Sequence, residues 1–86
     1  MLMIDKEGVI SQLQEACEKL KTDPESEFVL DFSSVRRVDA AAVLGLEKVA
    51  AVAGEKTVNV ALRGVNVDIY KVLKLVKLAP RFSFLN

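Results

Sequence analysis

The sequence predicts an α/β fold with a small, mostly parallel (mixed) sheet, and three observations lead to this prediction. Apolar runs short enough for strands alternate with three longer stretches whose apolar residues recur at helical spacing. Strands that alternate with helices need crossover connections, and right-handed crossovers place neighbouring strands parallel. The length of 86 residues, 51% of them hydrophobic, suits one domain with a modest core. We therefore expect a single domain over residues 1–86.

The first expected elements are a short strand at residues 1–4 and an amphipathic helix at residues 6–21. Asp5 can cap this helix, because its carboxylate can accept hydrogen bonds from the free amide groups of the first turn. Apolar residues recur at helical spacing on one face, at Leu13, Cys17 and Leu20. Cys17 is the only cysteine in the sequence, so we expect a buried thiol in a reducing compartment rather than a nucleophile.

A second strand is expected at residues 28–32, after a polar turn around Pro24. Its apolar residues do not alternate with polar ones, which is typical of a strand buried on both faces. A loop at residues 33–38 then leads to Asp39 and three alanines. Asp is a strong helix N-cap and Ala is the best helix former. We therefore predict that a helix begins just after Asp39, at the carboxyl end of a strand, where open α/β sheets usually place their working residues.

The helix after Asp39 is expected to end near residue 53, with Gly54 as its left-handed C-cap. At about 100° per residue, one face gathers the residues expected to contact the sheet, which are Ala42, Leu46, Val49 and Ala53. The opposite face carries Ala40, Leu44 and Ala51 between the charges of Glu47 and Lys48. This outward stripe is either an alanine-rich surface without a role or a docking face for another protein.

The second half of the chain predicts a strand at residues 57–62, a helix after Asn66, and a short strand or packed tail at residues 82–85. Asn66 is a candidate N-cap, and Asp68 suits the first turn of the helix. The apolar residues expected to be buried in this helix are Ile69, Val72, Leu73 and Val76. Its solvent side carries Lys71, Lys74 and Lys77, and Pro80 is expected to end it.

The composition argues against several classes of function. Twelve basic and twelve acidic residues cancel, which gives no support to a nucleic-acid partner. No apolar run reaches the roughly 18 residues that a membrane span needs, and the N-terminus lacks the plan of a secretion signal. We therefore expect a cytoplasmic protein without membrane insertion. The sequence contains no histidine and no glycine-rich phosphate loop, so we expect no metal, no cofactor and no catalysis.

Charged residues near the expected helix start have simple explanations. Asp39 is explained as a helix cap and Asp31 as the end of a strand. Arg36 and Arg37 could hold an anion beside a helix N-terminus, but solvated loop arginines are the simpler interpretation.

The segment VLDFSSVRRVDAAAVLGL, residues 29–46, resembles the central motif of STAS domains, the fold of bacterial anti-sigma factor antagonists. In that family an apolar strand ending in Asp leads through a short loop to the motif D-S-x-G and a helix. Residues 58–84 resemble the second half of the family, with a strand, a short turn, a helix containing a Val-Leu pair and a turn containing leucine. The resemblance covers the chain from about residue 6 onward.

The chain departs from the family pattern at the motif itself. Asp39 matches the motif aspartate, but Ala40 stands where many relatives carry a serine that a partner kinase phosphorylates. Ala42 stands on the motif glycine, and Leu44 stands where a further small residue is common. Since alanine has no hydroxyl, phosphate charge cannot be added beside Asp39 at this position. Most relatives also have a strand pair before the first helix, whereas this chain has only the short strand expected at residues 1–4. One edge of the sheet is therefore expected to be bare or covered by another chain, and a homodimer is one possible arrangement.

The resemblance implies a non-catalytic regulatory module whose partner is an anti-sigma factor of the histidine-kinase-like type or another signalling protein. The partner-binding residues expected from it are Ser33, Ser34, Arg36, Arg37, Asp39, Ala40, Ala41, Leu44, Glu47 and Lys48. Ser33 and Ser34 are expected to be turn formers rather than substitute phosphorylation sites. An alternative stays open, because some STAS domains without the serine are scaffolds or accessory subunits of larger signalling or transport complexes.

Overall fold

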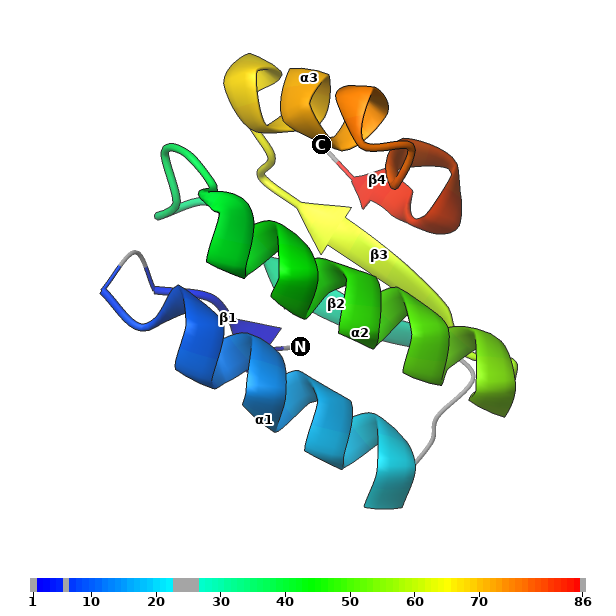
Figure 1. The fold of residues 1–86 in the computed structure, drawn as a ribbon. Helices are drawn as coiled ribbons and strands as arrows, with labels where there is room; N and C mark the ends of the chain where they lie inside the picture. The colour runs from blue at the N-terminus through cyan, green and yellow to red at the C-terminus, as the bar shows by residue number, and fades with distance from the viewer. Residues whose placement is uncertain (1, 6, 23–26, 86) are drawn as a thin grey trace.

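The computed structural model describes residues 2–5, 7–22 and 27–85, and within these residues strands and helices alternate along the chain (Figure 1). The elements in chain order are β1 (Leu2–Met3), α1 (Val9–Thr22), β2 (Glu27–Asp31), α2 (Ala40–Lys56), β3 (Asn59–Arg63), α3 (Val67–Leu75), a 3₁₀ turn (Ala79–Arg81) and β4 (Ser83–Leu85). The predicted α/β class is therefore confirmed.

The described strands form one sheet in the order β1-β2-β3-β4, and every pair is parallel. The sheet is thus wholly parallel rather than mixed. Because each crossover moves to the next strand in the same direction with the same hand, the helices cover the same face. Figure 1 shows α1 and α2 side by side across β1, β2 and β3, and the Tyr70 ring of α3 packs edge-on against Phe84 of β4.

One face of the sheet is left without helices among the described residues. The row Leu30, Leu62 and Phe84 lies on the helix side, where Leu30 and Leu62 are fully buried. On the other face, Met3 and Leu85 are 57% and 42% exposed and Val29 is half-buried, whereas Asp31 and Ala61 are buried. The prediction that β2 is buried on both faces therefore holds only in part, because the sequential strand order places α1 and α2 together on one side.

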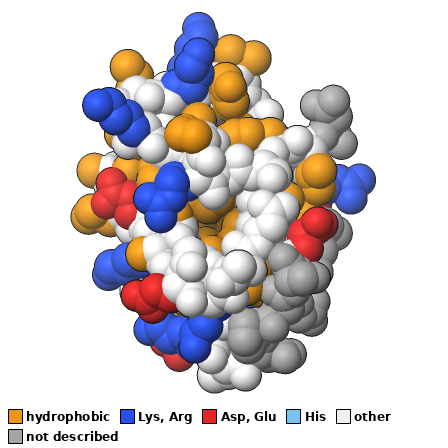
Figure 2. Space-filling model, turned by 90° about the vertical axis from the view of Figure 1, so that its right-hand side faces the viewer, with side chains coloured by type: hydrophobic (Ala, Val, Ile, Leu, Met, Phe, Trp, Pro, Cys, Tyr) orange, Lys and Arg blue, Asp and Glu red, His pale blue; other side chains and the backbone are white. Residues whose placement is uncertain are grey.

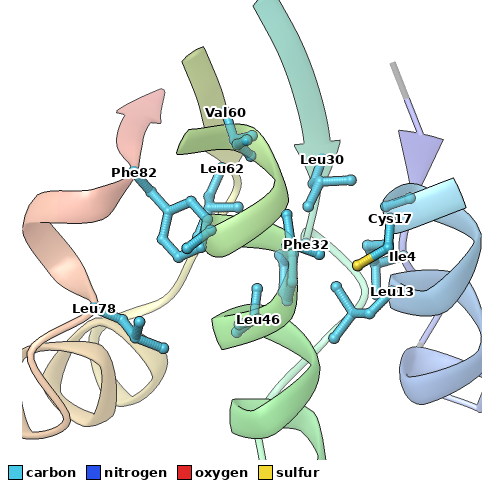
Figure 3. Packing of buried hydrophobic residues seen from close by; sticks show 14 of the residues in the cluster. Ile4, Leu13, Cys17, Leu30, Phe32, Leu46, Val60, Leu62, Leu78 and Phe82 are labelled. Atoms are coloured by element: carbon cyan, nitrogen blue, oxygen red, sulfur yellow. The ribbon is translucent and has the colours of Figure 1, made fainter. Parts of the chain in front are cut away.

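The core lies between the helices and the covered face of the sheet (Figure 3). Phe32 and Leu46 are fully buried at its centre, and Leu78 and Phe82, which follow α3 in the chain, extend it. Cys17 lies in the same cluster, so the prediction of a buried free thiol is confirmed. Burial raises the pKa of the Cys17 thiol, although Lys21 and Lys48 nearby oppose that change.

Gly45 determines how closely α1 and α2 approach each other. A Cβ atom on Gly45 would lie 3.0 Å from Cδ1 and 3.3 Å from Cβ of Leu13 on α1. The absence of a side chain therefore lets Leu13, which is fully buried, pack directly on the backbone of α2. This contact keeps α1 against the helix that carries the candidate site.

Several predicted boundaries in the first half are wrong. Helix α1 begins at Val9 rather than Lys6, because Asp5 makes a local turn in which its carboxylate accepts a hydrogen bond from the Glu7 amide at 3.2 Å. Helix α2 continues through Gly54 to Lys56, and Thr57 adopts the left-handed C-cap conformation instead. Strand β2 is shifted by one residue from the predicted range 28–32, and the start of α2 at Ala40 is as predicted. The expected turn around Pro24 lies outside the described residues.

The second half shows further corrections. Strand β3 spans Asn59–Arg63 rather than residues 57–62, and Val72 is half-buried rather than buried. Helix α3 ends at Leu75, so Val76 is its C-cap and is 39% exposed rather than buried. Pro80 does not end α3 but lies in the 3₁₀ turn that follows. The predicted N-cap Asn66 is confirmed, because its side chain accepts a hydrogen bond from the Ile69 amide at 2.8 Å.

Candidate docking site

The candidate site begins at the carboxyl end of β2, where Asp31 shapes the loop that follows. The Asp31 carboxylate accepts hydrogen bonds from the Ser33 amide, at 2.8 Å, and from the Ser33 hydroxyl. These two bonds lower the pKa of Asp31, and Arg63 on the neighbouring strand contributes in the same direction. Ser33 is therefore a turn former, as the sequence suggests, and Asp31 is a structural carboxylate that is only 7% exposed.

The lowered pKa of Asp31 predicts an acid-sensitive loop. A group with a depressed folded-state pKa contributes its full stability above its unfolded pKa, about 3.9 for Asp, and loses it as the pH falls through the folded pKa. Ser33→Ala, which removes the hydroxyl donor, should lower the free energy of unfolding at neutral pH and make its decline below about pH 4 shallower. Urea unfolding across the acid range measures both. An equally steep decline in the variant would mean that this hydrogen bond is not its cause.

Asn66 fastens the far end of the loop to α3. Its side-chain amide donates a hydrogen bond to the Arg36 carbonyl at 2.8 Å, while its carbonyl oxygen caps the helix. Val35 is buried and Val38 is half-buried, so the loop has apolar anchors as well. The sequence predicts the cap but gives no signal for the bond to Arg36, because the two residues are 30 positions apart. Hydrogen bonds at Ser33 and Arg36 and the apolar side chains of Val35 and Val38 therefore hold the loop, from which the polar side chains project.

The motif aspartate has the predicted role. The Asp39 carboxylate accepts a hydrogen bond from the Ala42 amide at 2.8 Å, and its extended backbone lets the helix begin at Ala40. The carboxylate also lies at the positive end of the α2 dipole.

Asp39→Ala should reduce the free energy of unfolding by about 1 kcal/mol, since an amide of the first turn loses its acceptor. Asp39→Asn keeps an acceptor oxygen and is the matched control, with a loss of well under half of that. Urea denaturation of the three proteins measures the differences. Equal losses in both variants would show that the charge, rather than the cap, is what stabilises α2.

The exposed stripe of α2 is confirmed. Ala40, Leu44 and Ala51 are exposed, with Leu44 at 57%, and Glu47 and Lys48 are exposed on either side of them. The four residues expected against the sheet are all buried. With 3.6 residues per turn, Ala40, Leu44 and Ala51 lie along one side of the helix.

A hollow that the sequence analysis missed adjoins the start of α2. It has a volume of about 550 Å³ and lies between the start of α1 and the start of α2. Arg37, Asp39 and Ala42 line one side, and Gly8, Ile10 and Gln14 are among the residues of α1 that line the other. Ile10 is 44% exposed there. The only signal for these α1 residues is their position on the polar side of an amphipathic helix, which by itself does not identify a site.

The structure places the loop residues of the candidate site beside the first turn of α2, whereas Glu47 and Lys48 lie in the middle of the helix, and Lys48 lines a hollow with Cys17 and Lys21 of α1. Ser33, Ser34, Arg36 and Arg37 are exposed in the loop, and Ala41 is exposed on the first turn of α2. Over the described parts of the chain, no three Asp, Glu or Cys side chains gather closely enough to hold a metal ion. In the same parts, none of the helices has the length and apolar character to cross a bilayer.

The fold defines the class of the protein as an α/β domain built on a four-stranded parallel sheet. A family model described as Mlab, STAS domain matches residues 6–80, and the chain therefore belongs to the STAS domain family. No curated protein matches the chain. The family includes anti-sigma factor antagonists and other signalling or transport-associated modules, and its members are generally non-catalytic modules that mediate protein–protein interaction.

Proposed function

We propose that this STAS domain binds a partner protein through the loop at residues 33–38 and the exposed stripe of α2, without phospho-control at Ala40. The observation that carries the proposal is Leu44, a large apolar side chain more than half exposed in the first turns of the helix. The buried centre of a docking interface is more apolar than the rest of the surface, and its rim is polar. Glu47 and Lys48 supply that rim.

Because Ala40 has no hydroxyl, phosphorylation at this position cannot release the partner. A phosphoserine there would add up to two negative charges beside Asp39, at the centre of the proposed interface. Alanine keeps the surface small and apolar in every state of the cell. Control of the docking at this position then falls to the state or the concentration of the partner.

By family resemblance, the first candidate partner is an anti-sigma factor of the histidine-kinase-like type, which the module would sequester. A second candidate function is that of an accessory subunit of a larger signalling or transport complex. The lack of the phosphorylatable serine favours the second, because a permanent subunit needs no release switch. A freely exchanging regulator would be lost from its partner during ion-exchange chromatography, whereas a subunit would stay at fixed stoichiometry.

Affinity purification of the tagged chain, with Leu44→Asp as the test variant, examines the docking face. Leu44→Asp should abolish recovery of the specific partner, since a charge would replace the apolar anchor. Met3→Asp is the matched control, because Met3 has the same exposure as Leu44, 57%, and lies outside the proposed interface. Full recovery with Leu44→Asp, or equal loss with both variants, would contradict the proposal.

Incubation with ATP and the cognate kinase tests the proposal that docking is not controlled by phosphorylation at Ala40. Mass spectrometry should find no phosphate on α2, and Ala40→Asp, which mimics the charge, should weaken partner recovery by about tenfold or more. Unchanged recovery with Ala40→Asp would place the contact elsewhere.

A further inference from the structure

A second surface, formed by α3, the 3₁₀ turn and β4, concentrates exposed apolar side chains. Among the described residues, eight large hydrophobic side chains are exposed, and five of them lie between residues 67 and 85. Val67 is 67% exposed and Tyr70 is 41% exposed. This surface is separate from the α2 stripe and is not used by the proposed function.

Two hollows lie on either side of the contact between Tyr70 and Phe84. The larger, of about 550 Å³, is lined by Tyr70, Lys74, Lys77, Ala79, Pro80 and Phe84. The smaller, of about 240 Å³, is lined by Val65, Asn66, Val67, Tyr70, Phe84 and Leu85. The two rings meet edge to face, with centroids 5.1 Å apart, so they form a shared wall between two apolar pockets. We call the two hollows together the α3–β4 groove.

Basic side chains outnumber acidic ones around the α3–β4 groove, although Asp68 follows Val67, a residue that lines the smaller hollow. No acidic residue follows Asp68 in the sequence, whereas Lys71, Lys74, Lys77 and Arg81 all do. Residues 63–86 carry a formal charge of +4 and residues 1–62 carry −4, although the whole chain is neutral. Lys74 places its Nζ 5.8 Å from the centroid of the Tyr70 ring, so one of these cations stands on the aromatic wall itself. Figure 2, which views the molecule from the side of Figure 1 on which the 3₁₀ turn and β4 lie, shows basic, acidic and hydrophobic side chains interspersed over the whole face.

We propose that the α3–β4 groove binds an acidic, apolar peptide segment of a partner protein. The two apolar hollows would each take an apolar side chain, and the carboxylates of the segment would meet Lys74 and Lys77. A hollow with an aromatic wall and a proline on its floor accommodates a protruding side chain, whereas a flat anionic membrane surface would engage only the protruding lysines.

The test uses a short fluorescein-labelled peptide in which Leu-Phe pairs alternate with Asp-Glu pairs. Fluorescence anisotropy should show saturable binding that weakens with salt, and amide shifts in a ¹⁵N spectrum should fall on residues 70–84. The double variant Lys74→Glu/Lys77→Glu should lose about tenfold or more in affinity. Lys19→Glu/Lys21→Glu on α1 makes the same change in net charge at exposed positions and should leave the affinity within about twofold.

Several outcomes would overturn the proposal. Equal binding of a peptide with serine in place of Leu-Phe would show attraction by charge alone. Binding of phosphatidylglycerol vesicles with no binding of the peptide would assign the surface to an anionic membrane. Self-association that the Lys74→Glu/Lys77→Glu variant abolishes, without peptide binding, would assign it to a second copy of this chain. Leu44→Asp should bind the peptide normally, so failure at the α2 stripe and failure at the α3–β4 groove can be told apart.

Discussion

Gly64→Ala is expected to destabilise the protein by about 3 kcal/mol. Gly64 has a φ of +73°, and a Cβ atom there would lie 2.4 Å from the Ser33 hydroxyl and 3.0 Å from the Ser33 backbone. The left-handed conformation costs alanine roughly 1–2 kcal/mol and the overlap adds roughly 1–3 kcal/mol. Because backbone atoms are among those overlapped, rotation of one side chain cannot relieve the contact. Urea denaturation measures the loss as a shift of the midpoint without a change of slope.

Gly54→Ala is the matched control for this substitution and is expected to act in the opposite direction. Gly54 lies in the last turns of α2, where the nearest atom to a new Cβ would be a terminal nitrogen of Arg81 at 3.8 Å. Alanine should therefore stabilise the helix by about 0.5–1 kcal/mol. A similar loss for both glycines would mean that neither the φ angle nor the contact with Ser33 matters.

Gly64 also connects the fold to the candidate site. The close approach of Gly64 lets the end of β3 pass directly beside Ser33, the residue that folds the loop onto Asp31. On the other side of the same connection, Asn66 holds the loop at Arg36. The turn after β3 therefore supports the loop after β2 from the neighbouring strand. A shift at Gly64 should change the presentation of the loop as well as the stability.

The sequence was sufficient to predict those parts of the fold that depend on local chemistry. Asp39 and Asn66 were recognisable as caps, because Asp and Asn side chains accept amide hydrogen bonds at a helix start wherever they occur. The two faces of α2 followed from a period of 3.6 residues. The ends of helices were harder to predict: Gly54 has the composition of a C-cap, but the helix continues until Thr57, where the chain turns into β3.

Contacts between residues distant in sequence account for what could not be predicted. The open face of the sheet follows from the order of the strands, which no single strand pattern contains. The hollow between α1 and α2 is lined by residues from both helices and from the loop before α2, and the two hollows of the α3–β4 groove share Tyr70 and Phe84, whose rings meet. The residues that form each of these features belong to different elements, so the sequence pattern of any one element shows them only as ordinary surface or core residues.

Leu46→Ala and Leu44→Ala should separate folding from docking on one helix. Leu46 is fully buried in the core, so its truncation leaves a cavity and should cost about 2–5 kcal/mol of unfolding free energy (Figure 3). Leu44 is 57% exposed two positions away, and its truncation should change stability by no more than about 0.5 kcal/mol. Denaturation curves of the two variants measure this difference directly.

In a binding assay, Leu44→Ala should have the larger effect and Leu46→Ala the smaller one. The assay is carried out well below the unfolding temperature of the less stable variant. Leu44→Ala should weaken recovery of the partner by about tenfold, because the proposed interface loses its main apolar contact. Leu46→Ala should bind normally to the extent that it is folded, since its side chain reaches no surface. If Leu44→Ala bound as well as the unmodified protein and Leu46→Ala alone failed, the exposed stripe of α2 would be an ordinary alanine-rich surface, and the partner would have to contact another part of the domain.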